Sequence, residues 1–279
     1  MSSRRARRGA AILSLCLGLL PATACGEFGG DAVKREASQA QKGQARNGQA
    51  RGGAGTSTQV TPVVMILGDS YTVGERGSQP ETTYAPAAAR LLGWQVVAAG
   101  KAGTGFVATG TRRRSTTQGG AGAARTSGQT FMGLFESQLG WRPAPDLLIV
   151  SGGHNDRKYP AMQTAQAARE LLSRAKLRWP GTPIVLIGPI WGNDTPAPAT
   201  LAIRDVLRGV AQELKIPFID PIAQRWITGN RATGTGNAPG YIRPDGVHPT
   251  IEGHRYLATR LVDDIKRLGL AHPTRKGTS

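Results

Sequence analysis

Ser70 is the residue from which any chemistry of this chain would start. It completes a Gly-Asp-Ser turn that directly follows an apolar run, Val63–Leu67. An apolar run that stops at small polar residues is typical of a buried strand followed by a turn, and open parallel sheets bind ligands at the carboxyl ends of their strands. A serine placed there is a candidate nucleophile if a base and an anion-stabilising pocket lie near it. The turn by itself is common in proteins and does not establish this.

The base and the carboxylate that orients it have a candidate pair near the C-terminal end. Asp245 and His248 lie three residues apart on one short turn. A serine hydroxyl is a poor nucleophile until a base takes its proton, and a histidine does this best when a carboxylate fixes its tautomer. A turn of this length can direct Asp245 to one ring nitrogen of His248 while the other nitrogen faces Ser70. The plainer alternative is a surface aspartate beside a helix-capping histidine.

Two glycine-rich turns offer donors for a developing oxyanion. The turn Gly100–Gly103 follows the apolar run Gln95–Ala99, and its glycines let a backbone N–H approach a ligand closely. The turn Gly152–Asp156 follows Leu147–Val150 and carries the side-chain amide of Asn155. Each preorganised donor in such a pocket is worth about 3–4 kcal/mol. Four polar clusters at strand ends or near the C-terminus therefore fit one acyl-transfer site.

With these four blocks in order, residues 62–270 resemble the SGNH (GDSL-like) hydrolases. The turn 68–70 is similar to the nucleophile block of that family, Gly153–Asp156 to its Gly-x-Asn-Asp block, and Asp245-x-x-His248 to its closing block. Any one of these blocks is common, whereas four in the family's order are specific. The residue after the serine is Tyr71 instead of the usual leucine, a change at a side chain that does not react.

The second block departs further from the family pattern. The family usually has an asparagine shortly before the glycine donor, and that position is Ala98 here. Gly103 aligns best with the donor glycine, and Gly100 is the alternative. The remaining histidines have lesser expected places: His154 in the wall of the site and His254 packed on, or exposed from, the last helix.

The resemblance implies a flavodoxin-like three-layer α/β/α fold and ester hydrolysis without a metal or other cofactor. It implies a triad of Ser70, His248 and Asp245. It also implies an oxyanion hole made by the N–H of Ser70, the N–H of Gly103 and the amide of Asn155.

The elements that must position these residues can be read from the hydropathy pattern. After Val63, short apolar runs alternate with amphipathic helical patterns, which predicts an α/β fold with a parallel sheet of about five strands covered on both faces. The runs are Val63–Leu67, Gln95–Ala99, Leu147–Val150, Ile184–Ile187 and Pro217–Ile219, and the helical patterns fall within 162–175, 203–214 and 257–268. Residues 107–128, with three arginines at 112–114, interrupt this alternation. They predict either a mobile solvated loop or an anion-attracting rim or lid beside the site.

The N-terminus predicts export. Four arginines among the first eight residues precede a short apolar run, Ala10–Leu20, and a small-residue exit, which are the three parts of a secretory signal covering residues 1–25. Ordinary cleavage after Ala24 is one route. The other is a lipoprotein, because the residues before Cys25 resemble a bacterial lipobox in which that cysteine becomes lipidated. Cys16 would leave with the signal, so no intramolecular disulfide is expected.

The rest of the chain divides into three predicted parts. Residues 26–60 contain almost no large apolar side chains and predict a flexible linker, residues 61–272 the hydrolase domain, and residues 273–279 a C-terminal tail. The net charge of +17 raises nucleic acid as a partner, but the charge is spread out and no aromatic RNA-binding pattern accompanies it. We therefore expect no nucleic-acid partner, and attribute the charge to contact with acidic envelope polymers or lipid head groups.

The sequence thus predicts an exported serine esterase or lipase, lipid-anchored at the cell membrane or secreted, that acts on a lipid or an acylated carbohydrate. One alternative is an envelope carbohydrate O-acetylesterase or O-acetyltransferase that uses the same residues. Another is an envelope-binding lipoprotein that has kept the fold without catalysis. The sequence does not specify the acyl chain, the alcohol or the oligomeric state, for which a monomer is the default.

Overall fold

The computed structural model describes residues 60–75, 79–110 and 128–275, all within one compact unit. The predicted signal peptide, the lipobox at Cys25, the linker up to residue 59 and the arginines at 112–114 lie outside the described residues, so those expectations stay predictions. Among the described helices, none has the length and apolar content needed to cross a bilayer.

Five parallel strands form one sheet in the order β2-β1-β3-β4-β5. The strands are β1 (Val63–Gly68), β2 (Gln95–Gly100), β3 (Leu147–Ser151), β4 (Ile184–Ile187) and β5 (Phe218–Ile219). Each strand begins and ends within one residue of a predicted apolar run. This strand order is that of flavodoxin-like folds. The predicted α/β fold with a central parallel sheet of five strands is therefore confirmed, and β1 lies between β2 and β3.

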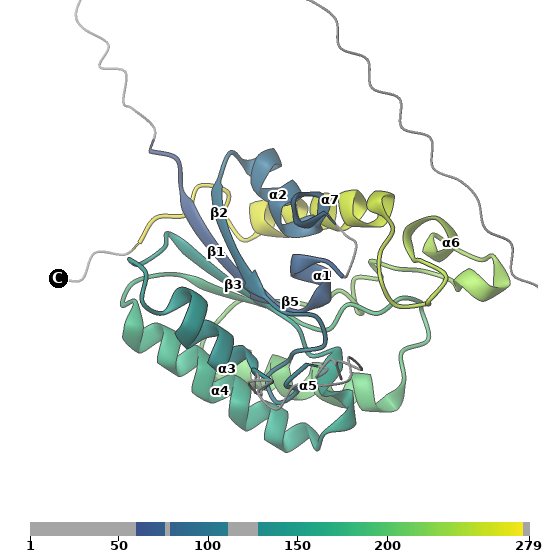
Figure 1. Cartoon of the computed structure of the whole chain (residues 1–279), viewed down its shortest axis with the longest axis horizontal. Helices are drawn as coiled ribbons and strands as arrows, with labels where there is room; N and C mark the ends of the chain where they lie inside the picture. Colours follow the sequence, from purple (N-terminus) through teal and green to yellow (C-terminus); the bar gives the residue numbers. More distant parts are fainter. Residues whose placement is uncertain (1–59, 76–78, 111–127, 276–279) are drawn as a thin grey trace, which may run out of the picture. The chain divides into compact units, whose positions relative to one another are not determined.

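Helices cover both faces of this sheet (Figure 1). One face is covered by α2 (Tyr84–Leu92) and α7 (Ile251–Arg267), and the other by α3 (Phe131–Leu134), α4 (Ala161–Arg178) and α5 (Pro198–Glu213). The shorter elements are α1 (Ser70–Val73), α6 (Ala238–Tyr241), the π-helical turn η2 (Phe135–Leu139) and the 3₁₀ turns η1 (Pro80–Thr82), η3 (Asn155–Lys158) and η4 (Arg231–Thr233). The three predicted helical patterns coincide with α4, α5 and α7, except that two of them end one residue beyond their helix, at Leu214 and Leu268.

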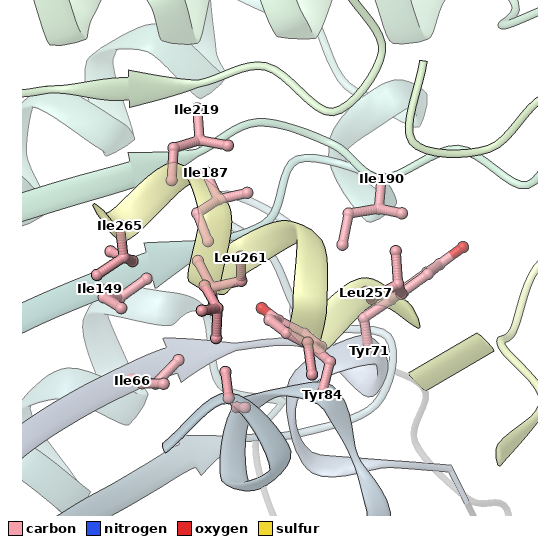
Figure 2. Close-up of a cluster of buried hydrophobic side chains, with 14 of the residues drawn as sticks. Ile66, Tyr71, Tyr84, Ile149, Ile187, Ile190, Ile219, Leu257, Leu261 and Ile265 are labelled. Atoms are coloured by element: carbon pink, nitrogen blue, oxygen red, sulfur yellow. The ribbon is translucent and has the colours of Figure 1, made fainter. Parts of the chain in front are cut away.

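Alternate residues of the strands face two separate cores. In β1, Val64 and Ile66 point towards α2 and α7, whereas Met65 and Leu67 point towards α3, α4 and α5, and all four are at most 2% exposed. Figure 2 shows the first of these cores, where isoleucines of four strands meet the leucines of α7. Complete burial of one such side chain contributes about 1.5–3 kcal/mol. Because β1 is packed on both faces, the residue that follows it is presented from a firmly held strand end.

The start of α7 is fixed two residues beyond His248. Thr250 caps the helix, and its Oγ1 accepts a hydrogen bond from the N–H of Gly253 at 2.9 Å. A side chain at Gly253 would lie 2.1 Å from the carbonyl oxygen of Tyr241, so only glycine fits there. The loop that carries His248 is therefore held at its C-terminal end by a packed helix.

Candidate active site

Ser70 is the first residue of α1 and lies at the carboxyl end of β1. Asp69 caps this short helix, and its Oδ1 accepts a hydrogen bond from the N–H of Tyr71 at 3.0 Å. Gly68 has no room for a side chain, because a Cβ there would lie 2.1 Å from Oγ1 of Thr72. The Gly-Asp-Ser sequence thus lets the strand turn directly into a helix, with Ser70 at 7% exposure on the sheet edge.

Ser70, His248 and Asp245 form one hydrogen-bonded series. Ser70 Oγ and His248 Nε2 are 3.0 Å apart, and His248 Nδ1 and Asp245 Oδ2 are 2.8 Å apart. Asp245 Oδ1 accepts hydrogen bonds from the N–H groups of Val247 and His248, both at 2.9 Å, across a turn that Gly246 makes with φ of 72°. Partial burial raises the pKa of Asp245, but hydrogen bonds from Val247 and His248 outweigh it and hold that pKa below its ordinary value.

A second carboxylate reaches the same nitrogen of His248. Glu75 Oε2 lies 3.3 Å from His248 Nδ1 and 3.4 Å from Nη1 of Arg243. Glu75 follows α1 after Gly74, whose φ of 82° turns the chain back towards the histidine loop. No motif in the sequence connects Glu75 to Ser70, so this contact could not be predicted. The contact arises only where the loop after α1 meets the loop before α7.

The two candidate oxyanion donors from the glycine-rich turns lie next to each other. Asn155 begins η3, and its Nδ2 donates to the carbonyl of Thr104 at 2.9 Å and lies 3.4 Å from Oδ2 of Asp69. Thr104 directly follows Gly103, which has φ of 78°. Gly100, the alternative donor, is the last residue of β2, where a Cβ would lie 2.2 Å from the backbone of β1. Gly103, and not Gly100, is therefore part of the turn that contacts Asn155.

Asp156 has a different task from Asn155 beside it. Its carboxylate is fully buried and accepts hydrogen bonds from three consecutive N–H groups, those of Phe106 at 3.0 Å, Val107 at 2.8 Å and Ala108 at 2.9 Å. Gly105 allows this approach, since a Cβ there would lie 2.3 Å from the carboxylate. Asp156 thus anchors the turn after β2 to η3. The first two residues of the predicted irregular stretch 107–128 are therefore hydrogen-bonded to Asp156. Residues 111–127 of this stretch lie outside the described residues.

Asp69 combines its capping role with an unusual protonation equilibrium. It is 3% exposed, and burial, followed by the charge of Asp156, raises its pKa from 3.8 to about 7 despite the hydrogen bond from Tyr71. Ser70, the candidate nucleophile, is therefore next to a carboxyl group that changes its charge near neutral pH.

Tyr71 connects α1, the helix that begins at Ser70, to the loop that carries His248. Its hydroxyl donates to the carbonyl oxygen of Val247, and its ring centroid lies 6.1 Å from that of His248 and 6.0 Å from that of His154. His154, expected in the wall of the site, is only 5% exposed, and burial lowers its pKa to about 4. His254, expected to be packed or exposed, is packed on α7 at 6% exposure. In the sequence, Tyr71 was expected to be a neutral replacement for leucine, and nothing there indicates its bridging contact.

An α/β/α sandwich with a serine, a histidine and a carboxylate at the carboxyl edge of its sheet belongs to a broad class of hydrolytic folds. Within that class, this chain belongs to the GDSL-like lipase/acylhydrolase family, whose sequence model matches residues 66–256. A GDSL lipase from Mycobacterium tuberculosis is 31% identical over 206 residues, which cover 71% of this chain and 79% of that protein. The protein is accordingly a carboxylic ester hydrolase.

Two solved structures illustrate the likeness of the fold. A GDSL-like lipase from Parabacteroides merdae superimposes with a TM-score of 0.55 at 20% identity, covering 75% of this chain and 96% of that one. Axe2, an acetylxylan esterase from Geobacillus stearothermophilus, gives a TM-score of 0.54 at 20% identity, covering 73% of this chain and 94% of that one. At such identities the resemblance extends to the fold alone.

Proposed function

We propose that this protein is an extracytoplasmic serine ester hydrolase that works through an acyl-enzyme on Ser70. The observation that carries this proposal is the hydrogen-bonded series in which Ser70 Oγ lies 3.0 Å from His248 Nε2 and His248 Nδ1 lies 2.8 Å from Asp245 Oδ2. These distances suit proton transfer from a hydroxyl to an imidazole that a carboxylate holds in one tautomer.

The proposed reaction has two halves. His248 takes the proton of Ser70 while Oγ attacks the ester carbonyl, and the resulting imidazolium then gives that proton to the departing alcohol. Water next attacks the acyl-enzyme, again with His248 as the base, and the carboxylic acid leaves as Ser70 regains its proton. Asp245 orients His248 and stabilises its charged form.

The oxyanion in both halves would be held by the N–H of Ser70, the N–H of Gly103 and the side-chain amide of Asn155. The amide of Asn155 has two N–H donors. One is held by the carbonyl of Thr104 at 2.9 Å, whereas the contact to Asp69 at 3.4 Å is long. A substrate oxygen can therefore take the second donor at little cost.

The test uses the purified chain and short p-nitrophenyl esters. Wild type should hydrolyse them, and Ser70→Ala should lower kcat by at least about a thousandfold, since loss of a triad nucleophile has effects of that size or larger. Ser137→Ala, an exposed serine on η2, is the matched control and should retain full activity. Full activity in Ser70→Ala would refute the assignment of the nucleophile.

Acylated carbohydrate is a second candidate substrate, as an O-acetylesterase or O-acetyltransferase. Its support is Trp191, a partly exposed indole whose ring centroid lies 5.1 Å from that of His154 and so close to the site. An aromatic face beside a hydrolytic site suits stacking against a sugar ring. Acetylated xylan set beside p-nitrophenyl esters of increasing chain length distinguishes a carbohydrate substrate from a lipid one. Added alcohol acceptors reveal transfer, and a fluorophosphonate probe that fails to label the protein would favour the non-catalytic binding alternative.

The proposed location rests on the first 25 residues alone. A charged start, a short apolar run and Cys25 in a lipobox-like context support export and lipidation. If Cys25 is lipidated, labelled palmitate should enter the wild-type protein, and Cys25→Ser should abolish the label and release the protein from membranes. Equal labelling of both proteins would contradict the lipid anchor, and retention of both in the cytoplasm would contradict export.

A further inference from the structure

We propose that Glu75 is a second positioning carboxylate for His248, which lies beside Asp245 at Nδ1 and stabilises the imidazolium formed during acyl transfer. This inference rests on the proposed role of His248 as the base. It adds to the triad a residue from the nucleophile loop itself, five positions after Ser70.

The geometry supports a direct action on the histidine. Asp245 Oδ2 forms the hydrogen bond with His248 Nδ1 at 2.8 Å, and Glu75 Oε2 lies 3.3 Å from the same nitrogen, within ion-pair distance. Asp245 also uses its other oxygen to accept two backbone N–H groups, which fixes its place in the turn. Glu75 instead arrives from a different segment, and its side chain is 34% exposed.

The charges around His248 come from two segments of the chain. Its own loop contributes Asp245 and Arg243, and Nη1 of Arg243 lies 3.4 Å from Glu75 Oε2. The segment after α1 contributes Glu75. Across the ring, the neighbouring titratable groups are Tyr71 on α1, His154 before η3 and His254 on α7. Burial raises the pKa of Tyr71 and lowers the pKa of both histidines to about 4, so all three are neutral at working pH.

Opposite effects of Glu75 and Arg243 follow from this arrangement. Removing the negative charge of Glu75 makes His248 lose its proton more easily, whereas removing the positive charge of Arg243 makes it hold the proton more tightly. If Glu75 served only to pair with Arg243, replacing either residue would break the same ion pair and give the same result. The two variants therefore separate a role at His248 from a structural role.

The experiment compares Glu75→Gln, Arg243→Gln and the matched control Glu81→Gln, whose carboxylate lies on the exposed turn η1. We expect the acidic limb of the kcat/KM profile to shift by about 0.5–1 pH unit to lower pH in Glu75→Gln and to higher pH in Arg243→Gln. Glu81→Gln should leave the profile in place. Shifts in the same direction for Glu75→Gln and Arg243→Gln, or none for Glu75→Gln, overturn the proposal.

A second comparison tests whether the two carboxylates share their task. Asp245→Ser removes the carboxylate but keeps a side-chain oxygen for the turn, so the loop stays capped. In that background Glu75→Gln should lower kcat/KM by about tenfold more than it does in wild type, because no carboxylate is left at Nδ1. An equal effect of Glu75→Gln in wild type and in Asp245→Ser would contradict a shared role of the two carboxylates at Nδ1. Unfolding midpoints of all variants identify any loss of folded protein.

A titration of His248 by nuclear magnetic resonance separates this inference from the proposed function. Asp69, with a pKa of about 7, also titrates in the range of the rate profile, so the imidazole resonances themselves must be followed. The titration needs no catalysis, so it can be carried out in the Ser70→Ala background. There, Glu75→Gln should still move the titration midpoint of His248 to lower pH. If the wild-type enzyme showed no Ser70-dependent hydrolysis but this shift were present, the proposed function would fail while the placement of Glu75 stood. An unchanged titration midpoint of His248 would contradict the inference about Glu75.

Discussion

Three aspartates around Ser70 differ in what surrounds their carboxylates. Asp245 lies in a partly exposed turn and stays charged because backbone N–H groups and His248 stabilise its ionised form. Asp156 is fully buried and is compensated by three N–H donors. Asp69 is almost as deeply buried but accepts only one short hydrogen bond, from Tyr71 at 3.0 Å. Burial raises the pKa of Asp69, so a pH effect on stability is expected from this group.

Asp69→Asn should stabilise the protein at neutral pH. The folded state holds the proton of Asp69 up to a pKa of about 7, whereas the unfolded chain releases it near 3.8, so wild type loses stability as the pH rises through this range. Asparagine removes that loss and still caps a helix well. We expect a gain of about 2–4 kcal/mol in unfolding free energy at pH 7.5 and little difference at pH 4. Urea denaturation at both pH values measures it.

Two buried histidines also make stability depend on pH, but they are present in both wild type and Asp69→Asn. His154 and His254, with pKa values lowered from 6.5 to about 4, act in the opposite sense, because protonation of the unfolded chain weakens the fold as the pH falls through that range. Both proteins contain these histidines, so the difference between them isolates Asp69. A constant difference between Asp69→Asn and wild type from pH 4 to 7.5 would contradict the raised pKa.

Tyr71→Phe should affect catalysis more than stability. The variant keeps the buried ring but loses the hydrogen bond to the carbonyl of Val247, next to His248, so the histidine loop can drift from Ser70. We expect kcat to fall about five- to twentyfold at nearly constant KM, since small errors in the alignment of reacting groups are amplified in the rate. Steady-state kinetics measure this. In Tyr84→Phe, which removes a buried hydroxyl bonded to Thr72, kcat should change little, and equal losses in both variants would contradict the bridging role.

At the scale of elements, the turn after β2 is held in place by η3. Asp156→Asn replaces one acceptor oxygen by a donor and leaves buried N–H groups of residues 106–108 without a partner. We expect the unfolding free energy to fall by about 2–4 kcal/mol and kcat/KM to fall with it, because the same turn carries Gly103. Urea denaturation and ester hydrolysis measure the two effects. Asp263→Asn, on the exposed side of α7, should change neither.

The strands could be predicted to within one residue because continuous apolar runs are their direct signature. The helices were harder to predict from the sequence. In α2 the buried face consists of Tyr84 and three alanines, which give a weak hydrophobic signal. The four-residue helices α3 and α6 are too short for any period to develop. In α5 and α7 the apolar spacing marks the buried middle of each helix. The start is determined locally, by the side-chain cap of Thr250 in α7 and by Pro198 at the first position of α5.

The same distinction holds for the site. Ser70, Asn155 and the pair Asp245 and His248 could be brought together in advance, because parallel strands end at one edge of a sheet. Glu75 could not, since it belongs to no block and reaches His248 through the fold of two loops distant in sequence. The anchoring role of Asp156 could not be predicted either, because its three partners are backbone N–H groups, which every residue except proline has.

At the scale of the whole molecule, activity should not depend on a metal ion. Within the described ranges, the ligating atoms of Glu75, Asp245 and His248 lie within 4.8 Å of one another and could be taken for a metal site. The guanidinium of Arg243 beside Glu75 opposes a cation there, and the Nδ1 proton of His248 is needed for the proposed mechanism. Prolonged incubation with EDTA should therefore leave ester hydrolysis unchanged. Loss of activity that zinc or magnesium restores would contradict this.

The position of β1 between β2 and β3 has a consequence for the order of folding. Its neighbour β3 begins about 80 residues later along the chain, and the helix that closes one of its faces is the last one described. A ribosome will have made the serine long before it makes the histidine, and contacts so distant in sequence form late in folding. On the proposed mechanism, the serine hydroxyl of a nascent chain therefore stays unactivated until α7 docks, and hydrolytic activity appears only once that helix is in place.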